Sequence, residues 1–180
     1  DDVMILLPGA IVIGILGGLI GPLFINLNTR INVYRKKLLT SGSIKVIETT
    51  IFGFGTAGIF FMLPYLFGSC NEVEGDKHLD YQKEAWCKEP GNGMITYNPL
   101  ASIFWASEGE IISNLMSSKF DIEVSELFVF MFAWYIQMTI TYGTNVPAGL
   151  FLPGMIVGSA LGEIMARSLK DNTNFGKYDE

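Results

Sequence analysis

Long stretches without a charged residue constrain this chain more than any other feature. They cover residues 3–29, 49–71 and 127–162 of the 180-residue sequence, and they are rich in Gly, Ile, Leu and Phe. A helix of about 20 apolar residues crosses the hydrocarbon core of a bilayer. The pattern therefore predicts an all-α integral membrane protein that crosses the bilayer several times, with a single transmembrane domain. The helices are expected at about residues 4–38, 43–67, 103–118, 123–142 and 149–169.

The polar segments between these runs predict the orientation of the chain. The first two runs are separated by a basic cluster without an acidic residue until Glu48. The positive-inside rule places this turn on the cytoplasmic side of the membrane. Topology is the simpler explanation of the charges, and a site for a lipid headgroup is the alternative. The cluster consists of Arg30, Arg35, Lys36, Lys37 and Lys45.

An acidic loop over about residues 69–100 is then expected on the opposite, non-cytosolic side. Its two cysteines, Cys70 and Cys87, are the only cysteines of the chain. Two thiols that bracket a loop outside the cytosol favour a disulfide, and two reduced cysteines are the alternative. After the loop, residues 103–118 are expected to form one short, partly inserted amphipathic helix. Its apolar side carries Ile111, Ile112, Leu115 and Met116, opposite Ser113, Asn114 and Ser117.

Several functional classes lack support in the sequence. The net charge is −6, and no basic surface interleaved with aromatic residues indicates nucleic acid as a partner. No nucleophile–base pair or phosphate loop indicates an enzyme or a cofactor. His78 is the only histidine and has no further ligands at a fixed spacing, so no metal site is expected.

The last uncharged run is too long for one simple helix and is interrupted by Gly143, Pro147 and Gly149. We therefore expect two helices joined by an irregular elbow, which is tolerated at membrane depth only where protein or a polar pathway satisfies the backbone. The first N–H groups of the second helix have no partner within that helix. Together with the positive end of the helix dipole, they form a candidate anion site.

The first half of this run also carries a few polar side chains. We expect them to form hydrogen bonds to neighbouring helices rather than to carry transport. They are Trp134, Gln137, Thr139 and Thr141.

The second helix starts at Gly149-Leu150-Phe151-Leu152-Pro153. This Gly-x-Phe-x-Pro pattern, with a helix rich in small residues after it, resembles a signature of the CLC chloride channel and transporter family. The order of the remaining segments resembles the first part of the second half of that family's fold. These segments are the long Gly-rich helix, the basic turn, the returning helix, the non-cytosolic loop, the short helix and the broken pair.

Two further segments, Tyr97-Asn98 and Thr141-Tyr142-Gly143, together with the loop cysteines, resemble the animal organellar and plant vacuolar members. The resemblance implies an endosomal, lysosomal or vacuolar membrane, with the plasma membrane as the alternative. It also implies two inverted repeats of tilted and broken helices, a homodimer, lipid as surroundings, and chloride or nitrate as the transported ion. The anion would be bound by the backbone of residues 149–153.

The family's other anion-binding motifs, of the Gly-Ser-Gly-Ile-Pro and Gly-x-Glu-Gly-Pro types, are absent from these residues. The chain is therefore expected to be a partial transmembrane domain that needs the remaining half of the fold. A non-transporting scaffold subunit or one half of a split transporter is the alternative. Glu163 lies far along its helix, and we expect it to be solvated or paired with Arg167 rather than to transfer protons.

Overall fold

The computed structural model describes residues 2–72, 85–87, 96–117 and 122–172. Within these residues the regular elements are six helices and two short strands that pair antiparallel, joined by turns and loops, so the all-α prediction is confirmed. His78 lies outside the described residues. The helices are α1 (Asp2–Leu38), α2 (Gly42–Phe67), α3 (Pro99–Phe104), α4 (Glu108–Met116), α5 (Val124–Thr141) and α6 (Phe151–Asn172), and the strands are β1 (Asn71–Glu72) and β2 (Thr96–Tyr97).

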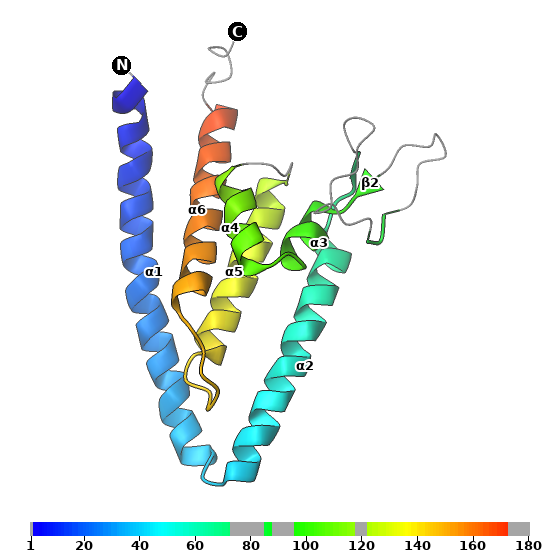
Figure 1. Cartoon of the computed structure of the whole chain (residues 1–180). Coiled ribbons are helices and arrows are strands. Elements are labelled where there is room, and N and C mark those ends of the chain that lie inside the picture. The colour runs from blue at the N-terminus through cyan, green and yellow to red at the C-terminus, as the bar shows by residue number, and fades with distance from the viewer. Residues whose placement is uncertain (1, 73–84, 88–95, 118–121, 173–180) are drawn as a thin grey trace.

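The helices α1 and α2 are two long arms that meet at the turn over residues 39–41, and α5 and α6 lie between them (Figure 1). Residues 7–38 of α1, all of α2 and all of α5 are each long and apolar enough to cross a membrane. Most apolar side chains on the two arms are exposed, including Leu19 at 64% and Phe54 at 77%. In a bilayer such surfaces face lipid or other helices.

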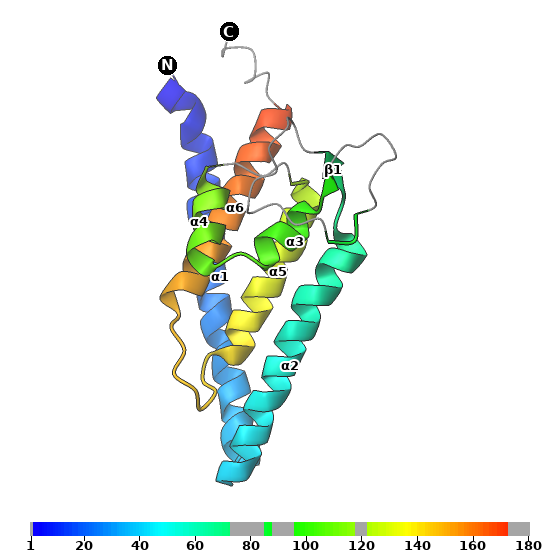
Figure 2. The same cartoon turned by 45° about the vertical axis from the view of Figure 1, so that its right-hand side comes forward.

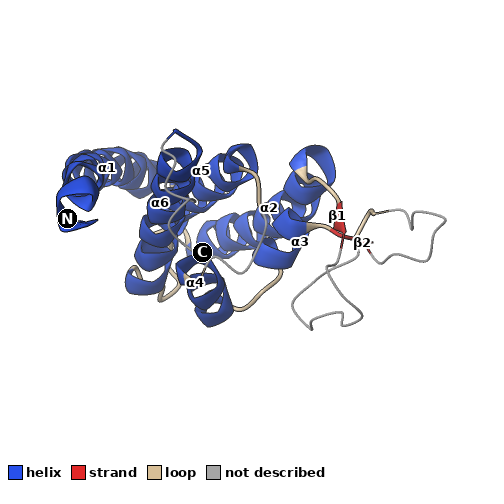
Figure 3. Cartoon of the chain, turned by 90° about the horizontal axis from the view of Figure 1, so that it is seen from above, coloured by secondary structure: helices blue, strands red, loops and turns tan. Residues whose placement is uncertain are grey.

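The hydrophobic core lies at the far end from this turn, where α3, α4, α5 and α6 pack together (Figure 2). Leu100 of α3, Phe130 of α5 and Ile156 of α6 are fully buried there. Seen from above, α1 lies at one end of the molecule and the strand pair at the other, with α5 and α6 between them (Figure 3). This packing fixes the positions of α5 and α6 and therefore of the segment that joins them.

The single helix expected over residues 103–118 is instead two helices, α3 and α4, separated at residues 105–107. Each has its own N-terminal cap. The Asn98 side chain accepts a hydrogen bond from the Ala101 N–H at 2.9 Å, and Ser107 forms a capping box with Glu110. The second cap starts a new helix axis, which propensity and spacing alone did not reveal.

The expected faces of this segment are also partly wrong. Ile111 and Leu115 are buried as predicted, but Asn114 is buried too, at 6% exposure, while Met116 is 76% exposed. The reason is that α4 packs against α6, and positions 111, 114 and 115 share one side of α4, which is the buried side. The position of the neighbouring helix, rather than the polarity of the residues, decides which side is covered.

Candidate functional site

The elbow over residues 142–150 reverses the chain between α5 and α6. At the end of α5, the N–H of Tyr142 donates to the Met138 carbonyl at 3.0 Å, and the N–H of Thr144 donates to the Thr141 carbonyl at 3.1 Å. Between them Gly143 has a φ of +98°, which a residue with a Cβ rarely adopts. The chain then returns along the bundle, so α6 begins farther from the α1–α2 turn than α5 ends (Figures 1 and 2).

The first helical hydrogen bond of α6 joins the Gly154 N–H to the Leu150 carbonyl at 3.1 Å. Leu150 is therefore the N-cap residue, and α6 itself starts at Phe151, two residues later than expected. The N–H groups of Leu150, Phe151 and Leu152 precede this first bond and have no acceptor within the helix. Pro153 has no N–H to satisfy, which suits the first turn of a helix. The geometry leaves three backbone donors at the positive end of a 22-residue helix.

A cavity of about 410 Å³ lies beside this helix start, between α2, α5, the elbow and the first residue of α4, Glu108, which is the one acidic residue among the described residues of the lining. Three of the five predicted site residues line it, namely Gly149, Leu150 and Pro153. Phe151 and Leu152 do not line it, and Phe151 is 78% exposed. The structure thus gives the side chain of Phe151 no contact with this cavity, and only its backbone belongs to the helix start.

The prediction that the polar side chains of α5 form hydrogen bonds to neighbouring helices is confirmed for Gln137 and wrong for Thr139. Gln137 does reach a neighbouring helix, because its Oε1 accepts a hydrogen bond from Thr56 Oγ1 of α2 at 3.3 Å. Thr139 instead donates to the Tyr135 carbonyl of its own helix at 2.7 Å. Trp134 Nε1 and Gln137 Nε2 are buried and have no partner within the described residues. Both residues line the 410 Å³ cavity.

The elbow is held from the other side by polar residues of α1. Asn28 Nδ2 donates to the carbonyls of Thr139 at 2.9 Å and Tyr142 at 2.6 Å, and Arg35 donates to the Ile140 carbonyl. These carbonyls belong to the last turn of α5, where the helix itself supplies no donor. Asn32 in turn donates to Asn28 Oδ1 at 2.9 Å. We call Asn28, Asn32 and Arg35 the α1 clamp.

Arg35 is also fixed by an ion pair with Glu48 of α2, at 2.6 Å between Nε and Oε1. The side chains of both residues are mostly buried, at 10% and 14% exposure. From the sequence, Arg35 was expected to mark topology or, alternatively, to belong to a lipid-headgroup site, and no role was predicted for Asn28 and Asn32. A signal existed, since positions 28, 32 and 35 fall on one side of an otherwise apolar helix.

Comparison with known proteins shows the family to which this chain belongs. Residues 4–177 match the sequence profile of the family described as "Voltage gated chloride channel". The chain belongs to the voltage-gated chloride channel family. The resemblance inferred from the Gly-x-Phe-x-Pro segment is thereby confirmed.

Curated relatives within this chloride channel family come from plants and animals. The chain is 34% identical to "Chloride channel protein CLC-d" of Arabidopsis thaliana over 175 residues, which cover 89% of this chain and 22% of the relative. It is 26% identical to "H(+)/Cl(-) exchange transporter 7" of Homo sapiens over 164 residues, which cover 91% of this chain and 20% of the relative. The chain therefore spans about a fifth of the length of these family members.

Two further predictions about this family member concern residues away from the elbow. Glu163 is 8% exposed and pairs with Arg167 at 2.8 Å, and Arg167 Nη1 donates to the Ile122 carbonyl at 2.7 Å. The pair at i and i+4 was one of the two expectations for Glu163, and solvation was the other.

Cys70 and Cys87 form a disulfide, as predicted. Trp86, next to Cys87, packs against Phe61, Tyr65 and Trp105 at the end of α2.

Proposed function

We propose that this chain forms one wall of the anion site in a chloride-transporting protein. The observation that carries the proposal is the start of α6. Three backbone N–H groups without a helical acceptor lie there beside a cavity of about 410 Å³, within a Gly-x-Phe-x-Pro segment. The backbone of residues 149–153 supplies the donors, and Gly149 leaves room for an ion to approach.

Backbone donors suit a transported anion better than a charged side chain does. Removing the hydration shell of chloride is costly, so the site must compensate for the lost water. A full positive charge at close range would bind the ion too strongly for rapid release. Aligned N–H groups and the helix dipole carry only partial charges, which lower the cost of dehydration and still let the ion leave.

The finer parts of the proposal come from the relatives. One of them is named a chloride channel protein and another an H(+)/Cl(−) exchange transporter, and we favour anion/proton exchange in an organellar membrane. Chloride is the proposed ion, and nitrate is the alternative. The complete protein is proposed to be a homodimer in lipid, in which a second half of the fold supplies the other walls of the site.

A second candidate function is a non-transporting scaffold subunit, or one half of a split transporter. The two candidates differ in what the helix start does: a transporter needs its N–H donors, whereas a scaffold needs only the helix itself.

Proline at position 151 separates these possibilities. Phe151 is the first residue of α6, where proline is well tolerated, so Phe151→Pro removes one N–H donor and keeps the helix. Loss of one hydrogen bond to a charged group costs about 1.5–3 kcal/mol, so the apparent chloride affinity of the complete protein should fall roughly 10- to 100-fold. Chloride flux into liposomes, measured against chloride concentration, gives this affinity.

The matched control is Phe151→Leu, which changes the side chain but keeps the N–H donor. Its chloride affinity should stay within about twofold of the wild-type value, because the ring is exposed and does not line the cavity. Leu150→Pro removes the neighbouring donor and serves as a second test if the first variant does not fold. A folded proline variant with wild-type affinity would count against the proposed site.

A further inference from the structure

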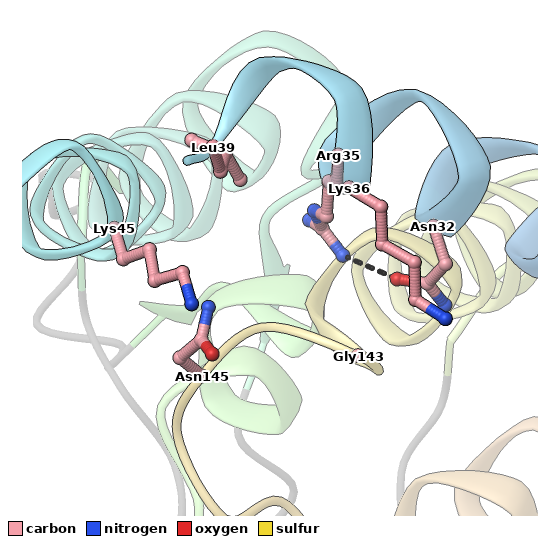
Figure 4. Close-up of a pocket in the computed structure, with 7 residues that line it drawn as sticks. All are labelled: Asn32, Arg35, Lys36, Leu39, Lys45, Gly143 and Asn145. Carbon is pink, nitrogen blue, oxygen red and sulfur yellow. Dashed lines mark hydrogen bonds between the residues drawn. The ribbon is translucent and has the colours of Figure 1, made fainter. Parts of the chain in front are cut away.

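A second cavity, of about 530 Å³, opens where the end of α1, the start of α2 and the elbow meet. Its size lies within the range of ligand pockets. Figure 4 shows Lys45 of α2 pointing toward Asn145 of the elbow, and Lys36 of α1 extending beside Asn32. Gly143 and Arg35 complete this part of the lining. We call this cavity the basic pocket.

The lining of the basic pocket contains three cationic side chains and no acidic one. The charge of Arg35 is already balanced by Glu48, and one N–H of Nη2 and one of Nη1 donate to the Ile140 carbonyl and to Asn32 Oδ1. Lys36 and Lys45 have no carboxylate partner among the described residues. The pocket therefore holds two positive charges that the described part of the chain does not compensate.

A role in topology alone does not explain this arrangement. Topology requires only that Lys and Arg flank the membrane spans on one side, whatever direction they face. Here two lysines from different helices line one cavity, although their like charges repel. Arg30 and Lys37 belong to the same basic cluster but do not line the pocket. Substituting either of them removes a positive charge from the same cluster without changing the lining of the pocket, so they serve as controls.

We propose that the basic pocket binds a phosphomonoester group. Such a group carries a charge of about −1.5 to −2 at neutral pH and three strong acceptor oxygens. Its oxygens can accept hydrogen bonds from the Lys45 ammonium group and the Asn145 amide, which lie next to each other, while Lys36 lines the same pocket and adds a second positive charge. A singly charged ion such as chloride would leave one of the two lysines without compensation.

The phosphomonoester can come from a lipid or from a soluble molecule. The positive-inside rule puts the pocket at the cytoplasmic leaflet, where basic pockets between transmembrane helices bind anionic headgroups. An occupant would touch α1, α2 and the elbow together. The proposal does not depend on chloride transport, because ligand binding is measured directly and without ion flux.

The test compares two anionic lipids on the complete protein in detergent. Fluorescent phosphatidic acid carries a phosphomonoester, whereas fluorescent phosphatidylserine carries only a phosphodiester. We expect phosphatidic acid to bind at least about fivefold more tightly than phosphatidylserine, because only the phosphomonoester can carry a second negative charge. Glycerol 3-phosphate, added as a competitor, reports whether the headgroup alone occupies the pocket.

The variants are Lys36→Gln/Lys45→Gln, which removes both uncompensated charges, and Lys37→Gln, which removes a charge outside the pocket. The double variant should bind phosphatidic acid about tenfold more weakly, and Lys37→Gln should stay within about twofold of the wild type. If glycerol 3-phosphate binds the wild-type protein in the absence of lipid, and binds the double variant more weakly, the pocket accepts a soluble phosphomonoester. Equal binding of the two lipids, or equal loss in both variants, overturns the proposal.

Discussion

At the residue scale, the elbow depends on the backbone of Gly143. Its φ of +98° is available to glycine, and a Cβ built at this position would collide with the side chain of Asn32. Gly143→Ala should therefore cost about 1–3 kcal/mol, because it combines a strained backbone with a clash against the α1 clamp. Thermal unfolding of the complete protein in detergent measures this loss.

The control for this substitution is Gly109→Ala in α4. Gly109 is exposed, and a Cβ there would meet nothing within 4 Å. In a helix, alanine is favoured over glycine by roughly 0.5–1 kcal/mol. The unfolding temperature of the control should therefore stay the same or rise. Similar unfolding temperatures for Gly143→Ala and the wild type would show that the elbow does not need this conformation.

At the scale of elements, the α1 clamp determines where α5 ends. Asn28 is 8% exposed and serves two carbonyls of the last turn of α5. Asn28→Leu keeps a similar volume but removes these two hydrogen bonds and the one that Asn28 Oδ1 accepts from Asn32, which leaves polar groups without partners. We expect a loss of about 1–3 kcal/mol in the free energy of unfolding. Because the elbow leads directly to the start of α6, the apparent chloride affinity should fall as well.

The same substitution at Asn26 is the control for the clamp. Asn26 lies on the exposed side of α1, where it accepts a hydrogen bond from Arg30 at 3.0 Å. Asn26→Leu should change stability by less than about 0.5 kcal/mol and leave the chloride affinity unchanged. If both leucine variants behave alike, the clamp has no special part in positioning the elbow.

The sequence predicted the elements of this fold better than their contacts. Uncharged runs and Gly or Pro interruptions are local signals, so the long helices and the break before Phe151 could be found from them. The division into α3 and α4 and the burial of Asn114 depend on where α6 packs. The clamp depends on α1 and α5 meeting across more than 100 residues of sequence, as in the hydrogen bond from Asn28 to Thr139. No local pattern specifies such a contact.

At the scale of the whole molecule, the apolar surface of the arms remains uncovered. A Cβ added at Gly14, Gly17, Gly18 or Gly21 of α1 would meet nothing within 4 Å. These glycines form two pairs four residues apart, a spacing that lets another helix approach closely in a bilayer. Their open face is consistent with packing against helices that lie outside these residues, as the proposed second half of the fold requires.

The open face of α1 also bears on whether residues 1–180 can form an anion path by themselves. The start of α6 supplies donors on one side of the proposed anion path. The start of α4 also reaches the 410 Å³ cavity, but it places the acidic Glu108 in the lining and carries a capping box between Ser107 and Glu110. An ion held on one side only keeps most of its hydration cost. Liposomes reconstituted with residues 1–180 alone should therefore release chloride no faster than protein-free liposomes. Chloride-selective efflux from them would show that these residues form a complete pathway and would refute the proposal of a shared site.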